Sequence, residues 1–193
     1  MKWWLWLHFV TDFGDILCVT AAAFVLLLWC WRFVNRITAS AFGLAFVVAV
    51  AATAAGKLLA QQWFTPIQEA SIWSLSDGAP SGHVTMSMLV YGMTAYFCLR
   101  SGRSWLAVAG GAAAVAILVG IIYTRVRLHA HTIPDVATGV ALGLLVLSFP
   151  LFIHRTDIHA PRPSVRWLLL GILVAVTVVQ LSGVRVKDDF GLL

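Results

Sequence analysis

Charge is scarce in this sequence. Only 11% of its 193 residues are charged, whereas 61% are hydrophobic, and the mean hydropathy is +0.91. A water-soluble domain usually carries about a quarter charged residues, so this chain has too little polar surface to cover a globule in water. The same counts exclude an intrinsically disordered chain, a collagen-like fibre and a disulfide-stapled secreted scaffold. The composition therefore predicts an integral membrane protein.

Cysteine and acidic residues are also few. Cys18, Cys30 and Cys98 all lie in apolar runs, where a thiol behaves as a small hydrophobic group, so they indicate no redox compartment. The acidic residues form no cluster of the kind that binds Mg²⁺, and no metal or other cofactor is predicted. The net charge of +5 is scattered between apolar stretches, which argues against a nucleic-acid partner, and the sequence indicates no protein partner.

Long apolar runs are abundant. A helix needs about 20 mostly apolar residues to cross the hydrocarbon core of a bilayer. Six windows approach that length and predict an all-α, polytopic membrane helical bundle of about six transmembrane helices, folded as one domain over residues 1–193. The windows are Ile16–Phe33, Ile37–Leu59, Val84–Leu99, Trp105–Tyr123, Val136–Ile153 and, as an extra C-terminal span, Trp167–Leu181.

The third window and the N-terminal residues differ from a simple span. The third window is short and contains polar residues, which predicts a helix that faces protein rather than lipid; they are Ser87, Tyr91 and Thr94.

Residues 1–15 have no small-residue cleavage site and are interrupted by Asp12 and Asp15, so they predict an interfacial segment rather than a signal peptide. Its tryptophans suit the headgroup level of a membrane; they are Trp3, Trp4 and Trp6.

Basic residues near the ends of the windows give an orientation. Three hairpins carry arginines at their turns, and the positive-inside rule places these turns in the cytoplasm. The tally is seven basic residues against six on the opposite face, or seven against three if Lys57, Arg125 and Arg127 belong to a functional site. The other turns then lie on the outer side, which is the periplasmic side in the bacterial inner membrane that we expect for this chain. The arginines at the three hairpins are Arg32, Arg36, Arg100, Arg103, Arg155, Arg162 and Arg166.

One polar segment on the outward side is Pro-Ser-Gly-His at residues 80–83, immediately before the third window. Ser81 is expected to act as the N-cap of that helix. The free N–H groups of a first helical turn form an anion site, and His83 would stand beside it.

A second polar segment, residues 124–135, lies between the fourth and fifth windows. Arg125 supplies a planar guanidinium that suits a phosphate. If the helical turn extends back to His131, the four-residue spacing places it on one face with Asp135. A carboxylate that holds one imidazole nitrogen fixes the tautomer and makes the other a better nucleophile.

Together these segments resemble the membrane-integrated lipid phosphatase branch of the type 2 phosphatidic acid phosphatase superfamily. Its signature has three blocks: Lys-x6-Arg-Pro, Pro-Ser-Gly-His and Ser-Arg-x5-His-x3-Asp. Residues 80–83 match the second block in full. Arg125, His131 and Asp135 match the third block at the family spacing, with Thr124 in place of serine. The motif core spans residues 57–135.

The resemblance implies a substrate class and a role for each residue. The substrate would be a lipid phosphate or diphosphate, of the undecaprenyl diphosphate, phosphatidic acid or phosphatidylglycerol phosphate type. His131 would attack phosphorus to give a phosphohistidine, Asp135 would orient it, and His83 would protonate the leaving oxygen and later activate water. The family needs no metal. The phosphoryl oxygens would be held by Lys57, Ser81, Gly82 and Arg125.

The first block is incomplete. Lys57 is present, but Phe64 stands where the family has arginine, and the proline comes one residue late, at Pro66. Because alternate positions in an extended segment point to one side, Arg127 or His129 could replace the missing arginine if residues 125–131 are extended.

Three other functions stay open. One is a lipid phosphotransferase of the same family. Another is a catalytically weakened protein that binds or moves lipid phosphates, which the incomplete first block suggests. The third is a haem or metal membrane protein that uses His83, His129 and His131.

Overall fold

The computed structural model describes residues 3–102, 104–156 and 164–182, with side chains from Trp6 onward. Within these ranges the regular structure is helical, apart from one isolated bridge between Thr65 and Ser76. The expected all-α fold is confirmed. The helices are α1 Trp3–Asp12, α2 Ile16–Phe33, α3 Arg36–Trp63, α4 Gly82–Arg100, α5 Trp105–Arg127, α6 Ile133–Thr156 and α7 Arg166–Ser182.

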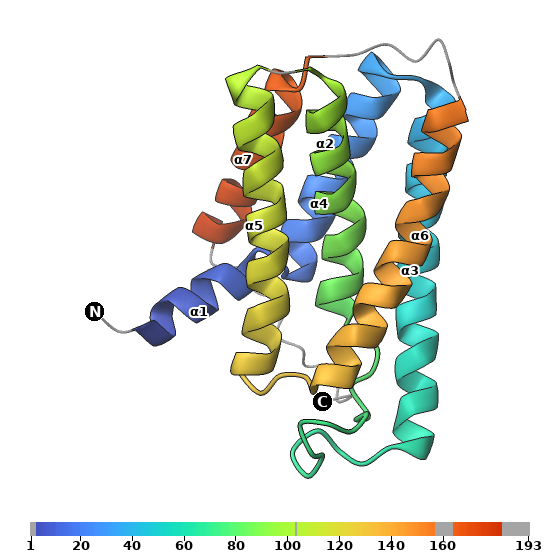
Figure 1. Ribbon diagram of the computed structural model, residues 1–193, viewed down its shortest axis with the longest axis vertical. Helices are drawn as coiled ribbons and strands as arrows, with labels where there is room; N and C mark the ends of the chain where they lie inside the picture. Colours follow the sequence, from blue (N-terminus) through green and yellow to red (C-terminus); the bar gives the residue numbers. More distant parts are fainter. Residues whose placement is uncertain (1–2, 103, 157–163, 183–193) are drawn as a thin grey trace.

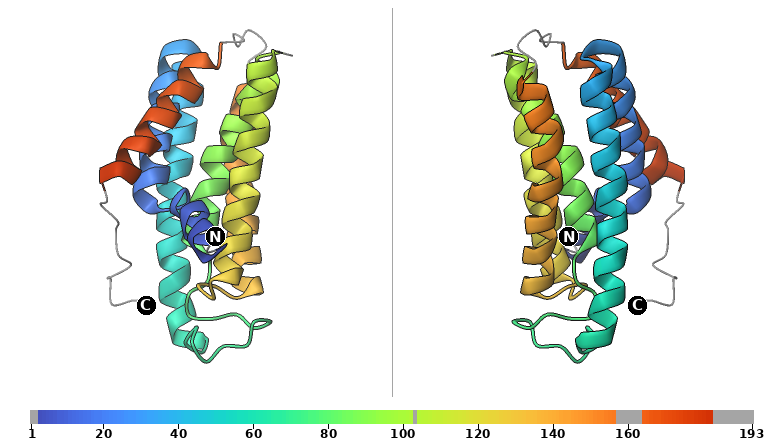
Figure 2. Two further views of the ribbon diagram at one scale, coloured as in Figure 1. Left: turned by 90° about the vertical axis from the view of Figure 1, so that its left-hand side faces the viewer. Right: turned by 90° about the vertical axis from the view of Figure 1, so that its right-hand side faces the viewer.

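The helices form a bundle in which successive members run in opposite directions (Figure 1). Helices α2 to α6 lie along the long axis, α7 packs against α2, and α1 projects from the side (Figure 2). The turns near Arg32, Arg36 and Arg100 therefore lie at one end of the bundle. The loop of residues 64–81 and the α5–α6 turn lie at the other end.

Four helices are long and apolar enough to cross a membrane, namely α2, α3, α5 and α6, and α7 is a shorter apolar helix. Helix α4 has a different environment, because Ser87, Tyr91 and Thr94 are each at most 2% exposed. The Tyr91 hydroxyl donates a hydrogen bond to the backbone oxygen of Phe13 at 2.9 Å. The prediction that the third window faces protein is confirmed.

Two helices extend by about a full turn beyond the C-terminal ends of their predicted windows. Helix α3 continues from Leu59 to Trp63, and α5 continues from Tyr123 to Arg127. A hydropathy window ends at the first polar residues, but a helix that leaves the hydrocarbon can continue through good helix formers such as alanine, glutamine and arginine. The long loop is therefore residues 64–81, shorter than the interval between the second and third predicted windows.

Helices α4 and α6 approach closely at the end that carries the polar segments. A methyl group at Gly139 of α6 would lie 2.8 Å from the backbone oxygen of Ser81. Thr85 of α4 donates its hydroxyl to the backbone oxygen of Gly139 at 3.1 Å. The start of α4 is thus fixed against the first turns of α6, which brings the two polar segments together.

Some expectations concern residues that the structure does not describe, including the side chains of Trp3 and Trp4 and the positions of Arg103 and Arg162. Trp6 is 56% exposed on α1. The interfacial position of residues 1–15 stays a prediction.

Candidate active site

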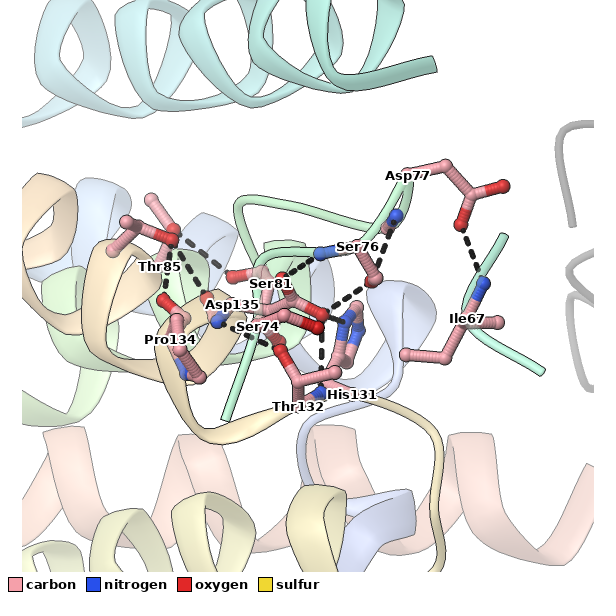
Figure 3. A network of polar contacts seen from close by, with 12 residues as sticks. Ile67, Ser74, Ser76, Asp77, Ser81, Thr85, His131, Thr132, Pro134 and Asp135 are labelled. Atoms are coloured by element: carbon pink, nitrogen blue, oxygen red, sulfur yellow. Dashed lines mark hydrogen bonds and ion pairs between the residues drawn. The ribbon is translucent and has the colours of Figure 1, made fainter. Parts of the chain in front are cut away.

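The candidate site lies at one end of the bundle, where four segments meet. The beginnings of α4 and α6 and the end of α5 gather beside the loop of residues 64–81, next to the last turns of α3 (Figure 1). Figure 3 shows the polar contacts that connect the loop to α4 and α6.

Helix α6 begins with a reciprocal cap. The backbone N–H of Asp135 donates to the Thr132 hydroxyl at 3.3 Å, and the backbone N–H of Thr132 donates to Oδ2 of Asp135 at 3.0 Å. This arrangement is a capping box. The helix therefore starts after Thr132 and does not extend back to His131, so the condition for placing His131 and Asp135 on one helix face is not met.

Asp135 is fully buried and holds its carboxylate in a set of donors. Besides Thr132, the carboxylate accepts two hydrogen bonds from Ser76: the backbone N–H donates to Oδ1 at 2.9 Å and the hydroxyl donates to Oδ2 (Figure 3). Charged acceptors make the stronger protein hydrogen bonds, so these contacts stabilise the carboxylate in its ionised form. Ser76 belongs to no motif, so sequence reasoning missed it.

His131 lies beside this carboxylate although it is outside the helix. Its Nδ1 is 3.8 Å from Oδ2 of Asp135, and its backbone N–H donates to the backbone oxygen of Arg125 at 3.2 Å. The ring also packs on the loop, because a methyl group at Gly78 would lie 3.3 Å from Nδ1. A turn rather than a helix thus brings His131 beside Asp135, and its buried Nδ1 makes no hydrogen bond within the described part of the chain.

The electrostatics around His131 favour a neutral imidazole. Burial lowers its pKa below the ordinary value, and the charges of Arg125 and Lys57 also lower it, while the contact with Asp135 raises it. A neutral ring at neutral pH keeps a lone pair on one nitrogen. That is the state a nucleophilic histidine needs.

The Pro-Ser-Gly-His segment brings the start of α4 to the same place. Ser81 occupies the N-cap position as predicted, but its side chain makes no capping hydrogen bond. Its backbone N–H donates instead to the backbone oxygen of Asp135 at 3.0 Å. Its buried Oγ has no hydrogen-bond partner in the described part of the chain. A buried hydroxyl of this kind is costly unless a ligand satisfies it.

Two cations approach the two histidines. Lys57 lies near the end of α3 and Arg125 in the last turn of α5, and both are half-buried. Burial lowers the pKa of His83 and of His131 below the ordinary value, and the charges of these two cations lower both pKa values further. Cations beside two imidazoles and the first turn of a helix form an environment that suits a phosphate group.

Comparison with known families identifies the chain. A family model of the PAP2 superfamily matches residues 58–158, just over half of the sequence. The chain belongs to the PAP2 superfamily. The match contains the second and third blocks, and Lys57 lies one residue before it. No curated protein and no solved structure matches the chain. Membership supports a phosphatase-type function on lipid phosphates.

The PAP2 signature is incomplete at Phe64, and the structure shows the place of that residue. Phe64 follows the last residue of α3 and is 42% exposed. Arg127 and His129 were proposed as substitutes on the condition that residues 125–131 are extended. That condition is not met, because Arg125 and Arg127 belong to α5. Residues two apart on a helix point about 200° apart. His129 is exposed, with φ 55°, just after the end of α5.

Arg127 points away along the surface of α5. It is exposed, and its guanidinium carbon lies 6.0 Å from the ring centroid of Tyr123, which is 55% exposed. Its role in phosphate binding stays a prediction, and the geometry favours Arg125.

A pair of substitutions tests this preference. We expect Arg125→Ala to lower kcat/KM for a lipid phosphate by about 100-fold, because it removes a cation beside the histidines. Arg127→Ala is an exposed change and is expected to stay within about threefold of the wild type. Phosphate release at several substrate concentrations measures both. A loss with Arg127→Ala as large as that with Arg125→Ala would restore Arg127 as the substitute for the missing arginine.

The residues that the structure describes contain no group of three or more histidine, cysteine, aspartate or glutamate side chains that could hold a metal ion.

Proposed function

We propose that this PAP2 protein hydrolyses a phosphate monoester or diphosphate on a membrane lipid through a phosphohistidine on His131. The observation that carries the proposal is His131 with its Nδ1 3.8 Å from the buried Asp135 carboxylate, in surroundings where burial and the charges of Arg125 and Lys57 lower the pKa of the ring. A nucleophile, its orienting carboxylate and compensating cations are the parts that phosphoryl transfer requires.

The reaction has two steps. In the first, Nε2 of His131 attacks phosphorus and the bond from phosphorus to the lipid oxygen breaks. His83 gives that oxygen a proton, which the ring gains when the phosphate anion of the substrate binds beside it and raises its pKa. In the second, His83 takes a proton from water, the water oxygen attacks phosphorus, and the bond to Nε2 breaks to release phosphate. Lys57, Arg125, the Ser81 hydroxyl and the Gly82 amide hold the phosphoryl oxygens, and electrostatic stabilisation of this kind supplies much of the catalysis.

The depth of the site supports a lipid substrate. With a rise of 1.5 Å per residue, about 20 residues of α3 span the ~30 Å hydrocarbon core. Counting from Arg36, at the start of α3, this length ends near Gly56. Lys57 is then at headgroup depth, where the phosphate of a lipid lies.

The distribution of basic residues supports the orientation. Arg32, Arg36, Arg100 and Arg155 lie at the helix ends opposite to the site. By the positive-inside rule that end is cytoplasmic. We therefore propose a bacterial inner membrane, with the site on the periplasmic or outer side and residues 1–193 acting as one domain.

A substrate panel tests the function. Purified protein in one detergent is given undecaprenyl diphosphate, phosphatidic acid or phosphatidylglycerol phosphate, and released phosphate is measured with and without EDTA. We expect release from at least one lipid, unaffected by the chelator. Binding without release from any of them would favour the catalytically weakened alternative. Transfer of the phosphoryl group to an added alcohol in preference to water would favour the phosphotransferase.

A further inference from the structure

We propose that Ser76 is a positioning residue that holds the Asp135 carboxylate in the orientation facing His131. The inference rests on the proposed function, because its catalytic effect requires His131 to be the nucleophile. Ser76 lies outside the three signature blocks, four residues before Pro80.

Ser76 contacts the carboxylate at both oxygens. Its side chain is fully buried, its backbone N–H donates to Oδ1 at 2.9 Å, and its hydroxyl donates to Oδ2. Figure 3 shows Ser76 reaching Asp135 from the loop. Two contacts from one residue to two oxygens fix the plane of a carboxylate, which a single contact does not.

The loop around Ser76 is itself held in place. The backbone N–H of Asp77 donates to the backbone oxygen of Thr65 at 3.1 Å, and Oδ1 of Asp77 accepts from the Ile67 N–H at 3.0 Å. On the other side, the Ile133 N–H donates to the backbone oxygen of Ile72 at 3.0 Å. These bonds anchor the loop to itself and to the start of α6, so Ser76 is presented at a fixed position.

The arrangement has a chemical consequence at Oδ2. This atom accepts from the Ser76 hydroxyl and from the Thr132 N–H, and it lies 3.8 Å from Nδ1 of His131. Without the hydroxyl, Oδ2 keeps only the hydrogen bond from the Thr132 N–H, and the carboxylate is held less firmly in its plane. Less of its charge is then satisfied by the loop, and a less satisfied carboxylate favours the protonated form of a neighbouring imidazole.

The test uses Ser76→Ala with Ser74→Ala as the matched control. Ser74 is in the same loop, but its hydroxyl donates to the backbone oxygen of Ser71. Partners that orient a catalytic ligand typically contribute 10- to 100-fold, so we expect Ser76→Ala to lower kcat by about that factor with KM within about threefold. Ser74→Ala is expected to keep the wild-type kcat.

Two further measurements separate positioning from a general structural role. Because Ser76 acts through Asp135, adding Ser76→Ala to Asp135→Asn is expected to cause little further loss of kcat. Diethylpyrocarbonate acylates neutral imidazole, and its reaction with His131 can be followed by mass spectrometry as a function of pH. The midpoint of the pH dependence of His131 acylation is expected to rise by ~0.5 pH unit or more in Ser76→Ala. It is expected to be unchanged in Ser74→Ala.

The outcomes separate the two proposals. Wild-type kcat together with a wild-type midpoint in Ser76→Ala would overturn the role of Ser76, as would a kcat loss that adds to that of Asp135→Asn with no change in midpoint. If the wild type releases no phosphate from any lipid, the proposed function fails. The midpoint of His131 acylation in Ser76→Ala still decides whether Ser76 positions the Asp135 carboxylate beside His131. Monodisperse elution in detergent verifies that each variant is folded.

Discussion

His131→Ala is expected to lower phosphate release by about 10⁴-fold or more, because removal of a covalent nucleophile eliminates the reaction path rather than weakening it. Substrate binding is expected to change much less, since Lys57 and Arg125 stay in place. Initial rates with the best lipid of the panel measure the loss. Quenching the wild type in alkaline detergent during turnover with ³²P-labelled lipid preserves the acid-labile P–N bond and is expected to trap label on His131, and the variant is expected to trap none.

His129→Ala is the control for this substitution. His129 is two residues earlier, is exposed and lies just after the end of α5. It is expected to keep wild-type turnover and labelling. A His131→Ala protein that elutes as a single species and still releases phosphate at the normal rate would exclude the phosphohistidine mechanism.

The second large effect is expected from Asp135→Asn. The carboxylate accepts hydrogen bonds from the N–H and hydroxyl of Ser76 and from the N–H of Thr132. In asparagine an NH₂ group replaces one carboxylate oxygen and cannot accept the hydrogen bonds that this oxygen received. An unsatisfied buried polar group costs about 1–3 kcal/mol. The variant also loses the charge that orients His131, and such a change in a catalytic triad costs about 10⁴-fold in kcat. We expect both lower thermal stability and a kcat reduced by about 10³- to 10⁴-fold.

Asp77→Asn separates these effects from a general disturbance of the loop. Asp77 uses Oδ1 to accept from the Ile67 N–H, and an asparagine carbonyl can accept the same bond. The kcat of Asp77→Asn is therefore expected to stay within about twofold of the wild-type value. Equal losses in Asp77→Asn and Asp135→Asn would show that the loop, and not the Asp135–His131 pair, controls turnover.

Several parts of the site were predictable because they depend on local sequence. Residues 80–83 and the spacing of Arg125, His131 and Asp135 point to the PAP2 superfamily without any coordinates, and the family comparison agrees. The missing arginine at Phe64 is equally visible in the sequence. Which side chain satisfies each polar group was not predictable, as Ser81 shows: a serine before a helix is usually a cap, but here its side chain makes no capping bond.

The sequence by itself determined the membrane character of the chain, the helical class, and the approximate helix positions, because apolar runs of membrane-spanning length allow few other structures. It also determined which chemical groups are available. Only the tertiary structure decided that the loop of residues 64–81 reaches α6. Ser76 and Asp135 are 59 residues apart in the chain, and no periodicity or local motif couples residues at that separation. Their contact follows from the close packing of α4 on α6 and the path of the loop, which are properties of the folded bundle as a whole.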